Sequence, residues 1–198
     1  MEGHGQEDGQ VLAAFPAAVA AVLVVVAHLE IGDMKIARLL KHFLYPPWLV
    51  RLKFPPATMK NIEAAIRKSE TLHNAEIRFA VESSLDLLEL FHDKSSFDRA
   101  VDVFAQLGIW DTEQNNGVLI YLLLADHKIE IIADRGVNRK VAAKDWQRIC
   151  RLMETLFRQK EFQAGVLAGI DEISKLLVEL YPAGKDDDNE LSNEPVVL

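Results

Sequence analysis

One apolar run constrains the fold of this 198-residue chain more than any other feature of its sequence. Residues 118–125 read VLIYLLLA, with no charged side chain and no alternation of apolar and polar positions. The run is too short for a typical helix and is flanked by polar residues, so it predicts a strand that is buried on both faces. We expect this strand at the centre of a sheet that helices cover.

Two neighbouring segments have the pattern of further strands. Residues 128–133 alternate between polar and apolar positions, and only Asp126 and His127 separate them from the apolar run, which predicts a hairpin. Residues 76–83 alternate in the same way and predict a half-exposed strand earlier in the chain. Because a helix is expected between residues 76–83 and the central strand, the sequence predicts a mixed sheet.

Helical spacing of apolar residues predicts four helices around these strands. The first is expected to start with Thr58 as its N-cap, and the second to follow Ser95 and end near Gly108. The second helix is expected to bury one face, which carries Phe97, Val101 and Phe104. The last two have apolar stripes within residues 146–157 and 166–180.

Composition divides the chain into four parts. Residues 1–33 are an apolar leader with five acidic and no basic residues, and residues 34–57 combine a basic amphipathic helix with a proline-rich connector. Residues 58–182 form the folded domain, and residues 183–198 are expected to be an acidic, disordered tail. The formal net charge of −8 lies in the two ends, so the near-neutral middle favours no nucleic-acid partner.

The leader has two interpretations, and both stay open. Residues 11–27 carry no charge and would span roughly 26 Å as a helix, close to the minimum for crossing a bilayer. The six basic residues between Met34 and Lys60, with no acidic one, would then keep the domain on the cytoplasmic side. Alternatively, Met34 is the true start, residues 1–33 are an upstream extension, and the domain is cytoplasmic.

The basic segment after the leader also has two interpretations. Its helix, within residues 35–44, could lie on an anionic membrane surface, or its apolar face could pack on the domain. The side chains expected to face such a membrane are Lys35, Arg38, Lys41, Arg51 and Lys53. A protein partner at the membrane is the other partner that we expect.

Several kinds of site are excluded by what the sequence lacks. A single cysteine, Cys150, cannot supply a multi-cysteine zinc or iron–sulfur site or a paired haem attachment, and its place on an apolar stripe predicts an inert thiol. The chain also has no glycine-rich phosphate loop, so we expect no nucleotide.

Polar residues gather on both sides of the predicted hairpin. Asp111, Asn115 and Asn116 precede its first strand, Asp134 follows its second, and Asp145 opens the next helix. The start of one antiparallel strand and the end of the next lie at the same edge, so carboxylate and amide oxygens could converge there. Such donors suit Ca²⁺ or Mg²⁺ rather than zinc. The alternative is ordinary turn and cap chemistry.

The order of these elements resembles the TPM domain, which occurs in bacterial envelope-linked and thylakoid lumen proteins. The resemblance rests on NNGVLIYLLLADHKIEIIADRGVN, on the helix near Trp146 and on FQAGVLAGIDEISKLL, and the sequence is most similar to a short proteobacterial form. It implies a three-layer α/β/α sandwich, Rossmann-like but without a nucleotide-binding loop. Some relatives are reported to bind divalent metal or to show acid phosphatase activity, and others act as assembly or repair factors.

Two functions follow as expectations. The first is a non-enzymatic interaction domain in a membrane- or envelope-related process, with divalent-metal binding as an optional property, because no nucleophile, base and oxyanion donor can be placed together from the sequence. The alternative is a metal-assisted acid phosphatase for phosphomonoesters, in which Asp111, Asp134 and Asp145 hold one ion.

Overall fold

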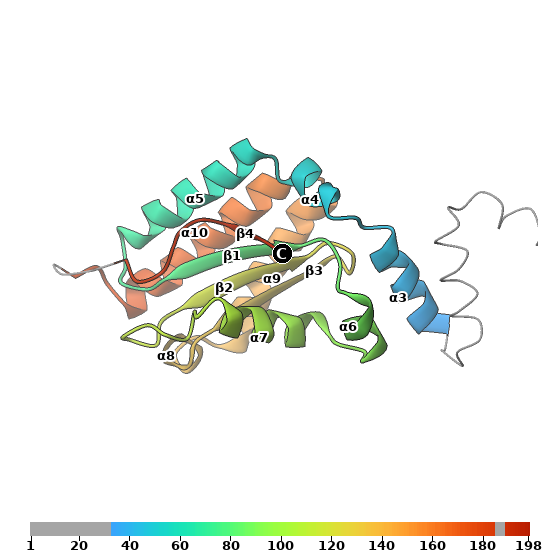
Figure 1. The fold of residues 1–198 in the computed structure, drawn as a ribbon. Coiled ribbons are helices and arrows are strands. Elements are labelled where there is room, and N and C mark those ends of the chain that lie inside the picture. Colours follow the sequence, from blue (N-terminus) through green and yellow to red (C-terminus); the bar gives the residue numbers. More distant parts are fainter. Residues whose placement is uncertain (1–32, 185–188) are drawn as a thin grey trace, which may run out of the picture. The chain divides into compact units, whose positions relative to one another are not determined.

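The computed structural model describes residues 33–184 and 189–198, and the chain divides into two compact units, residues 1–40 and 41–198. The second unit contains a four-stranded mixed sheet with the strand order β3-β2-β1-β4 (Figure 1). β1 (Ile77–Glu82) pairs in parallel with β2 (Val118–Leu123) and with β4 (Val196–Val197), and β2 pairs antiparallel with β3 (Lys128–Ala133). The predicted mixed sheet is therefore confirmed.

Helices cover both faces of this sheet and complete the α/β sandwich (Figure 1). α5 (Pro56–Glu70), α9 (Ala143–Arg158) and α10 (Phe162–Leu180) lie on one face, and α7 (Ser96–Gln106) lies on the other. Three shorter helices are α4 (Trp48–Lys53), α6 (Leu87–Phe91) and α8 (Arg135–Asn138). The fold class predicted from the sequence is thus the observed one.

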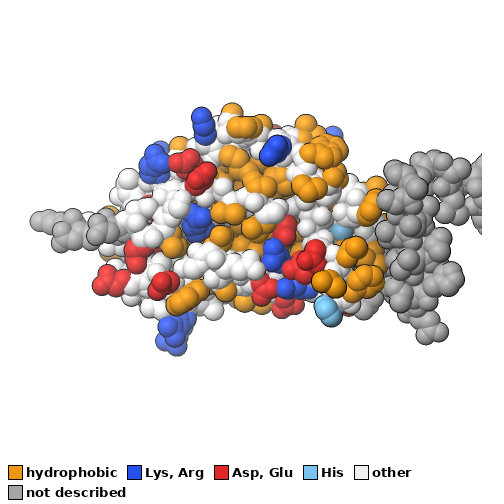
Figure 2. All heavy atoms as spheres, viewed as in Figure 1, with side chains coloured by type: hydrophobic (Ala, Val, Ile, Leu, Met, Phe, Trp, Pro, Cys, Tyr) orange, Lys and Arg blue, Asp and Glu red, His pale blue; other side chains and the backbone are white. Residues whose placement is uncertain are grey.

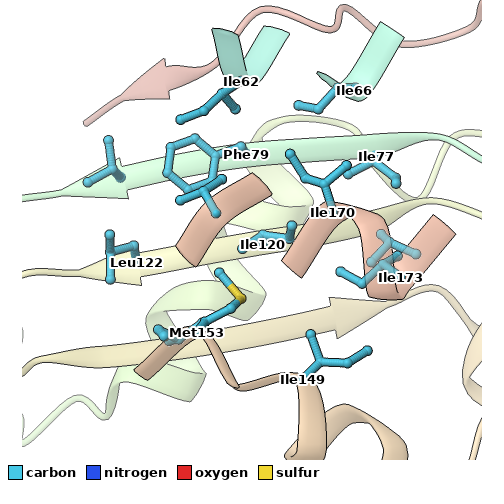
Figure 3. Packing of buried hydrophobic residues seen from close by; sticks show 14 of the residues in the cluster. Ile62, Ile66, Ile77, Phe79, Ile120, Leu122, Ile149, Met153, Ile170 and Ile173 are labelled. Atoms are coloured by element: carbon cyan, nitrogen blue, oxygen red, sulfur yellow. The ribbon is translucent and has the colours of Figure 1, made fainter. Parts of the chain in front are cut away.

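The main core lies between the sheet and the three-helix layer. Figure 3 shows side chains from α5, β1, β2, α9 and α10 meeting there, among them Ile62, Phe79, Ile120, Met153 and Ile170. Each of these five side chains is at most 2 % exposed. Because α10 approaches α9 closely, a Cβ atom at Gly169 would lie only 2.5 Å from the Sδ atom of Met153. Any larger residue at this position would force the Met153 side chain to move.

The opposite face of the sheet is built around a buried ion pair. Glu82 accepts hydrogen bonds from Arg99 Nε at 2.9 Å, from Arg99 Nη2 at 3.0 Å and from the Tyr121 hydroxyl at 2.6 Å. A second polar contact joins α7 to β3, where the Ser96 hydroxyl donates to Glu130 at 2.6 Å. β1 is buried at every position, so the half-exposed strand predicted from its alternation is not observed. Glu82 itself is buried through its contacts with Arg99 and Tyr121.

The same contacts rotate α7 away from the predicted orientation. Phe97 and Val101 were expected to face the core, yet they are 55 % and 41 % exposed. Phe104 is buried as predicted, but the helix buries Ala100 and Val103 in place of Phe97 and Val101. This orientation lets Arg99 and Ser96 face their carboxylate partners on the sheet. The predicted helix start is confirmed, since the Ser95 hydroxyl accepts a hydrogen bond from Asp98 N.

Two element ends differ from the prediction. α5 begins at Pro56, and Thr58 lies buried inside it, because proline already has the backbone angle that the first helical turn requires. The hairpin loop has four residues, 124–127, since Leu123 pairs with Lys128. Leu124 and Ala125 donate backbone hydrogen bonds to Glu82 and Ser83 instead of pairing with β3.

Residues 189–198, expected to be part of a disordered tail, lie along β1 and end in β4. Leu198 N donates to Val81 O, and the amides of Glu190 and Leu191 donate to the Glu76 carboxylate, which is 4 % exposed. The polar part of the tail is held by hydrogen bonds to Glu76, and the two valines near its end pair with the edge of β1.

The candidate membrane anchor, residues 11–27, lies outside the described residues. Within residues 33–184 and 189–198, every helix is too short or too polar to cross a membrane. The basic amphipathic helix predicted at residues 35–44 corresponds to α3 (Asp33–Phe43).

Candidate functional site: the loops at one end of the β2–β3 hairpin

Two loops meet at the end of the hairpin where β2 begins and β3 ends. We call residues 115–117 and 134–136 the loop clasp. Asp134 N donates to Gly117 O at 2.8 Å, and Gly136 N donates to Asn115 O at 3.0 Å. The antiparallel pairing of Val118 with Ala133 brings the two loops to the same edge, as the sequence predicted.

Both glycines of the loop clasp are required by close approach. A Cβ atom at Gly117 would lie 2.2 Å from Ile109 O, and one at Gly136 would lie 2.4 Å from Asn115 O. Both neighbours are backbone atoms, which cannot move aside as the end of a side chain can. The loop clasp therefore holds its polar side chains on a closely packed backbone.

Two buried oxygen atoms of the loop clasp have no hydrogen-bond donor in the described part of the chain. They are Asn116 Oδ1 and Asp134 Oδ2. The rest of Asn116 is satisfied, since its amide nitrogen donates to Asn74 O and its backbone nitrogen donates to Thr112 Oγ1 at 3.0 Å. The other carboxylate oxygen of Asp134 caps α8 by accepting from Arg135 N. A buried acceptor without a donor costs about 1–3 kcal/mol, so these atoms need an explanation.

Asn115, the third predicted ligand in the loop clasp, already contacts the guanidinium group of Arg135. Asn115 Oδ1 accepts from both Nε and Nη2 of Arg135, each at 3.0 Å. Asn115 is in the left-handed region with φ 53°, a conformation that asparagine tolerates better than most residues. The role of Arg135 was not predicted from the sequence, although its position one residue after Asp134 places it in the same loop.

The remaining two predicted ligands lie on other elements. Asp111 is exposed in the turn after α7, and Asp145 is half-buried in the first turn of α9. In the described residues, no three His, Cys, Asp or Glu side chains are grouped so that they could hold a metal ion. Asn115, Asn116 and Asp134 are thus the predicted ligands that the hairpin brings together.

Two titratable groups elsewhere have strongly shifted pKa values. Burial raises the pKa of Glu70 to about 8, even though hydrogen bonds from Ile77 N and Asn193 Nδ2 favour its charged form. Burial likewise raises the pKa of the Cys150 thiol to about 11, so the thiol stays protonated and poorly nucleophilic at neutral pH. This agrees with the inert cysteine expected from the sequence.

Comparisons with known proteins give a consistent picture. The family model described as the TPM domain matches residues 54–176. The solution structure of BA42 protein from the psychrophilic bacterium Bizionia argentinensis has a TM-score of 0.64 and 32 % identity, and covers 72 % of this chain and 93 % of its own. No curated protein matches the sequence.

A second solved structure supports the fold alone. It is the N-terminal domain of a protein from P. gingivalis, with a TM-score of 0.53 and 16 % identity, covering 71 % of this chain and 94 % of its own. Since the family model spans more than half of the sequence and BA42 aligns over most of both chains, the chain belongs to the TPM domain family.

Proposed function

We propose that this TPM domain is a non-catalytic interaction module whose loop clasp binds a divalent cation, Ca²⁺ or Mg²⁺, in a membrane- or envelope-related process. The observation that carries the proposal is the pair of buried oxygen atoms without donors, Asn116 Oδ1 and Asp134 Oδ2. Amide and carboxylate oxygens are the ligands that these two ions prefer.

Arg135 sets the expected strength of binding. Its guanidinium occupies Asn115 Oδ1, and its positive charge opposes a cation in the same loops. The loop clasp also supplies one carboxylate, and affinity for calcium falls with the number of charged ligands. We therefore expect weak, millimolar binding, as in extracellular calcium modules.

A thermal-shift titration tests this proposal. A tenfold excess of ion over the dissociation constant stabilises the folded state by about 1.4 kcal/mol. For a chain of this length that corresponds to a rise in Tm of roughly 3–6 °C. Asp134→Asn keeps the helix cap and should abolish the rise, whereas Arg135→Ala frees Asn115 Oδ1 and should enlarge it.

The matched control is Asp171→Asn, because Asp171 is 68 % exposed on α10 and should not affect the shift. Asp111→Asn and Asp145→Asn decide whether these two predicted ligands contribute. If neither the wild type nor Arg135→Ala responds to 10 mM Ca²⁺ or Mg²⁺, an excess chosen for millimolar affinity, the cation site is refuted.

The alternative function, a metal-assisted acid phosphatase, is tested on the same proteins. It needs Asp111, Asp134 and Asp145 to hold one ion, while Asp111 is exposed and Asp145 lies on α9. Turnover of a generic phosphomonoester with Ca²⁺, Mg²⁺ or Mn²⁺, lost in Asp134→Ala, would favour the enzyme. Absence of turnover would favour binding without catalysis.

A membrane surface is the partner that the exposed side chains of the connector favour. Figure 2 shows hydrophobic side chains at the surface over α4 and α6. Trp48 is 62 % and Leu52 69 % exposed, and the basic residues Lys41 and Arg51 lie exposed nearby in the sequence. Tryptophan with basic neighbours suits the interface of an anionic bilayer, and the same basic segment supports a position on the cytoplasmic side.

Vesicle co-sedimentation tests this second part of the proposal. The protein should bind vesicles that contain phosphatidylglycerol more than phosphatidylcholine vesicles, and Trp48→Ala combined with Arg51→Gln should reduce binding. Phe97→Ala is the matched control, because Phe97 is 55 % exposed but lies on α7. Equal binding to both kinds of vesicle would contradict the electrostatic part of the proposal.

A further inference from the structure

A cavity of about 600 Å³ lies at the end of the hairpin opposite the loop clasp, where β2 passes into β3. Its walls come from the end of α4, the hairpin loop, the last turn of α9 and the start of α10. Four of the lining residues are apolar, namely Leu122, Leu124, Phe157 and Phe162. A volume of this size is typical of small-molecule sites, which are mostly apolar with a few polar groups.

The cavity has an excess of positive charge. Lys53, Lys128, Arg158 and Lys160 line it together with two acidic residues, Asp126 and Glu154. Both acids have basic partners, since Asp126 lies 3.0 Å from His42 Nε2 and Glu154 lies 3.6 Å from Arg158.

Three lysines that line the cavity have no acidic partner among the described residues. Lys53, Lys128 and Lys160 have no carboxylate oxygen within 4.0 Å in the described part of the chain. Burial, and then the nearby charge of Lys160, lower the pKa of Lys53. An anion between these two lysines would relieve their repulsion.

The apolar part of the cavity is held in place by aromatic packing. The rings of Phe157 and Phe162 lie 5.5 Å apart, and Lys53 Nζ lies 4.3 Å from the centroid of Phe162. A Cβ atom at Gly165 would lie 2.4 Å from the Phe157 ring, so the glycine allows this ring to pack against α10. The cavity therefore combines a fixed apolar wall with a charged group directly above it.

Two residues of the cavity adopt a backbone conformation that glycine would adopt at lower cost. Lys160 has φ 66° just after α9, and His127 has φ 52° in the hairpin loop. The left-handed conformation is strained for a residue with a Cβ atom. His127 is further held by Tyr45, whose hydroxyl lies 2.9 Å from His127 Nε2. In both places a side chain lines the cavity where a glycine would leave none.

We propose that this cavity binds a small amphiphilic anion, with an apolar chain or ring against Leu122, Leu124, Phe157 and Phe162 and a carboxylate or phosphate at Lys53 and Lys160. The apolar wall without the lysines would suit any hydrophobic ligand, and the lysines without the wall would suit any anion. Their combination selects a ligand that has both parts.

The test uses dodecanoate below its micelle-forming concentration, with binding followed by calorimetry and by backbone amide spectra in the presence of EDTA. EDTA separates this proposal from the cation site at the other end of the hairpin. We expect Lys53→Gln and Lys160→Gln each to weaken binding about five- to tenfold, as the loss of one favourable charge contact would. Dodecyltrimethylammonium, which has the same chain and the opposite charge, should bind more weakly than dodecanoate.

Lys140→Gln is the matched control variant. Lys140 Nζ lies 4.1 Å from the centroid of the Tyr181 ring, so the variant removes a similar lysine–aromatic contact outside the cavity and should leave binding unchanged. Thermal melting of each variant confirms that it is folded.

The source of the ligand is distinguished by a second arm with vesicles that contain phosphatidylglycerol. Binding of free dodecanoate that depends on Lys53 assigns the cavity to a soluble acid. Lys160-dependent binding to vesicles alone assigns it to an anionic lipid. The proposal is overturned if dodecanoate and dodecyltrimethylammonium bind equally, or if Lys140→Gln weakens binding as much as the cavity variants.

Discussion

The buried ion pair under α7 makes a sharp prediction for stability. Replacing Arg99 with alanine removes both hydrogen bonds that the guanidinium donates to Glu82 and leaves the Tyr121 hydroxyl as the donor. The side chains of Glu82 and Arg99 are 9 % and 14 % exposed, so water can replace little of what is lost. Arg99→Ala should therefore leave a buried carboxylate without its charged partner.

The size of the effect follows from this burial. Breaking one partner of a buried ion pair costs about 3–5 kcal/mol, a large part of a typical stability of about 5–15 kcal/mol. In a chain of this length the Tm should fall by roughly 6–20 °C. Replacing the whole cluster, with Glu82→Leu, Arg99→Met and Tyr121→Phe together, should restore most of the loss, because no polar group is then left without a partner.

Urea denaturation followed by circular dichroism measures these differences. Arg148→Ala is the matched control, because Arg148 forms a 2.5 Å contact with Glu172 but is 51 % exposed, and surface pairs contribute about 0–1 kcal/mol. The reasoning is refuted if Arg99→Ala loses no more stability than Arg148→Ala, or if the triple variant is less stable than Arg99→Ala.

Three further substitutions and one measurement of thiol reactivity test other parts of the structure. Between pH 4.5, the ordinary pKa of Glu70, and about pH 8, the folded state keeps a proton on this carboxyl group that the unfolded state has released. The free energy of unfolding should therefore fall as the pH rises across this range, by up to about 1.4 kcal/mol per pH unit. Glu70→Gln should flatten that slope in urea titrations at several pH values. Leu122→Asp should cost at least several kcal/mol because Leu122 is 2 % exposed, and an unchanged Tm would contradict its burial. Gly136→Ala should lower stability by roughly 1–3 kcal/mol in the same assay, since its Cβ meets Asn115 O. Cys150, with its pKa raised to about 11, should react with iodoacetamide at pH 8 far more slowly than free cysteine, and equal rates would argue against its burial.

The central strand and the hairpin could be predicted because their signals are local. The apolar run that begins at Val118 and the alternation after His127 are visible within one stretch of sequence. The loop clasp followed from them, since antiparallel pairing brings Asn116 and Asp134 to the same edge. Their pairing needed no knowledge of the rest of the fold.

Other features depend on contacts between distant segments and could not be predicted in this way. β4 is a strand because β1 offers a free edge, and its own sequence has no strand pattern long enough to recognise. The rotation of α7 depends on Arg99 meeting Glu82, and apolar spacing alone favoured Phe97. The cavity draws its lining from residues as far apart as Lys53 and Phe162, so no single stretch of sequence reveals it.

At position 160, the residue that would stabilise the fold most differs from the residue that would bind an anion best. At a left-handed position directly after a helix, glycine is the residue that stabilises a protein most, and Lys160→Gly would relieve the backbone at φ 66°. The same substitution would remove a cation from the wall of the cavity. A stability screen of this chain would thus rank Lys160→Gly as an improvement, whereas selection for an anionic ligand would reject it. A disagreement between the two rankings is the trade-off expected at residues kept for function rather than for the fold.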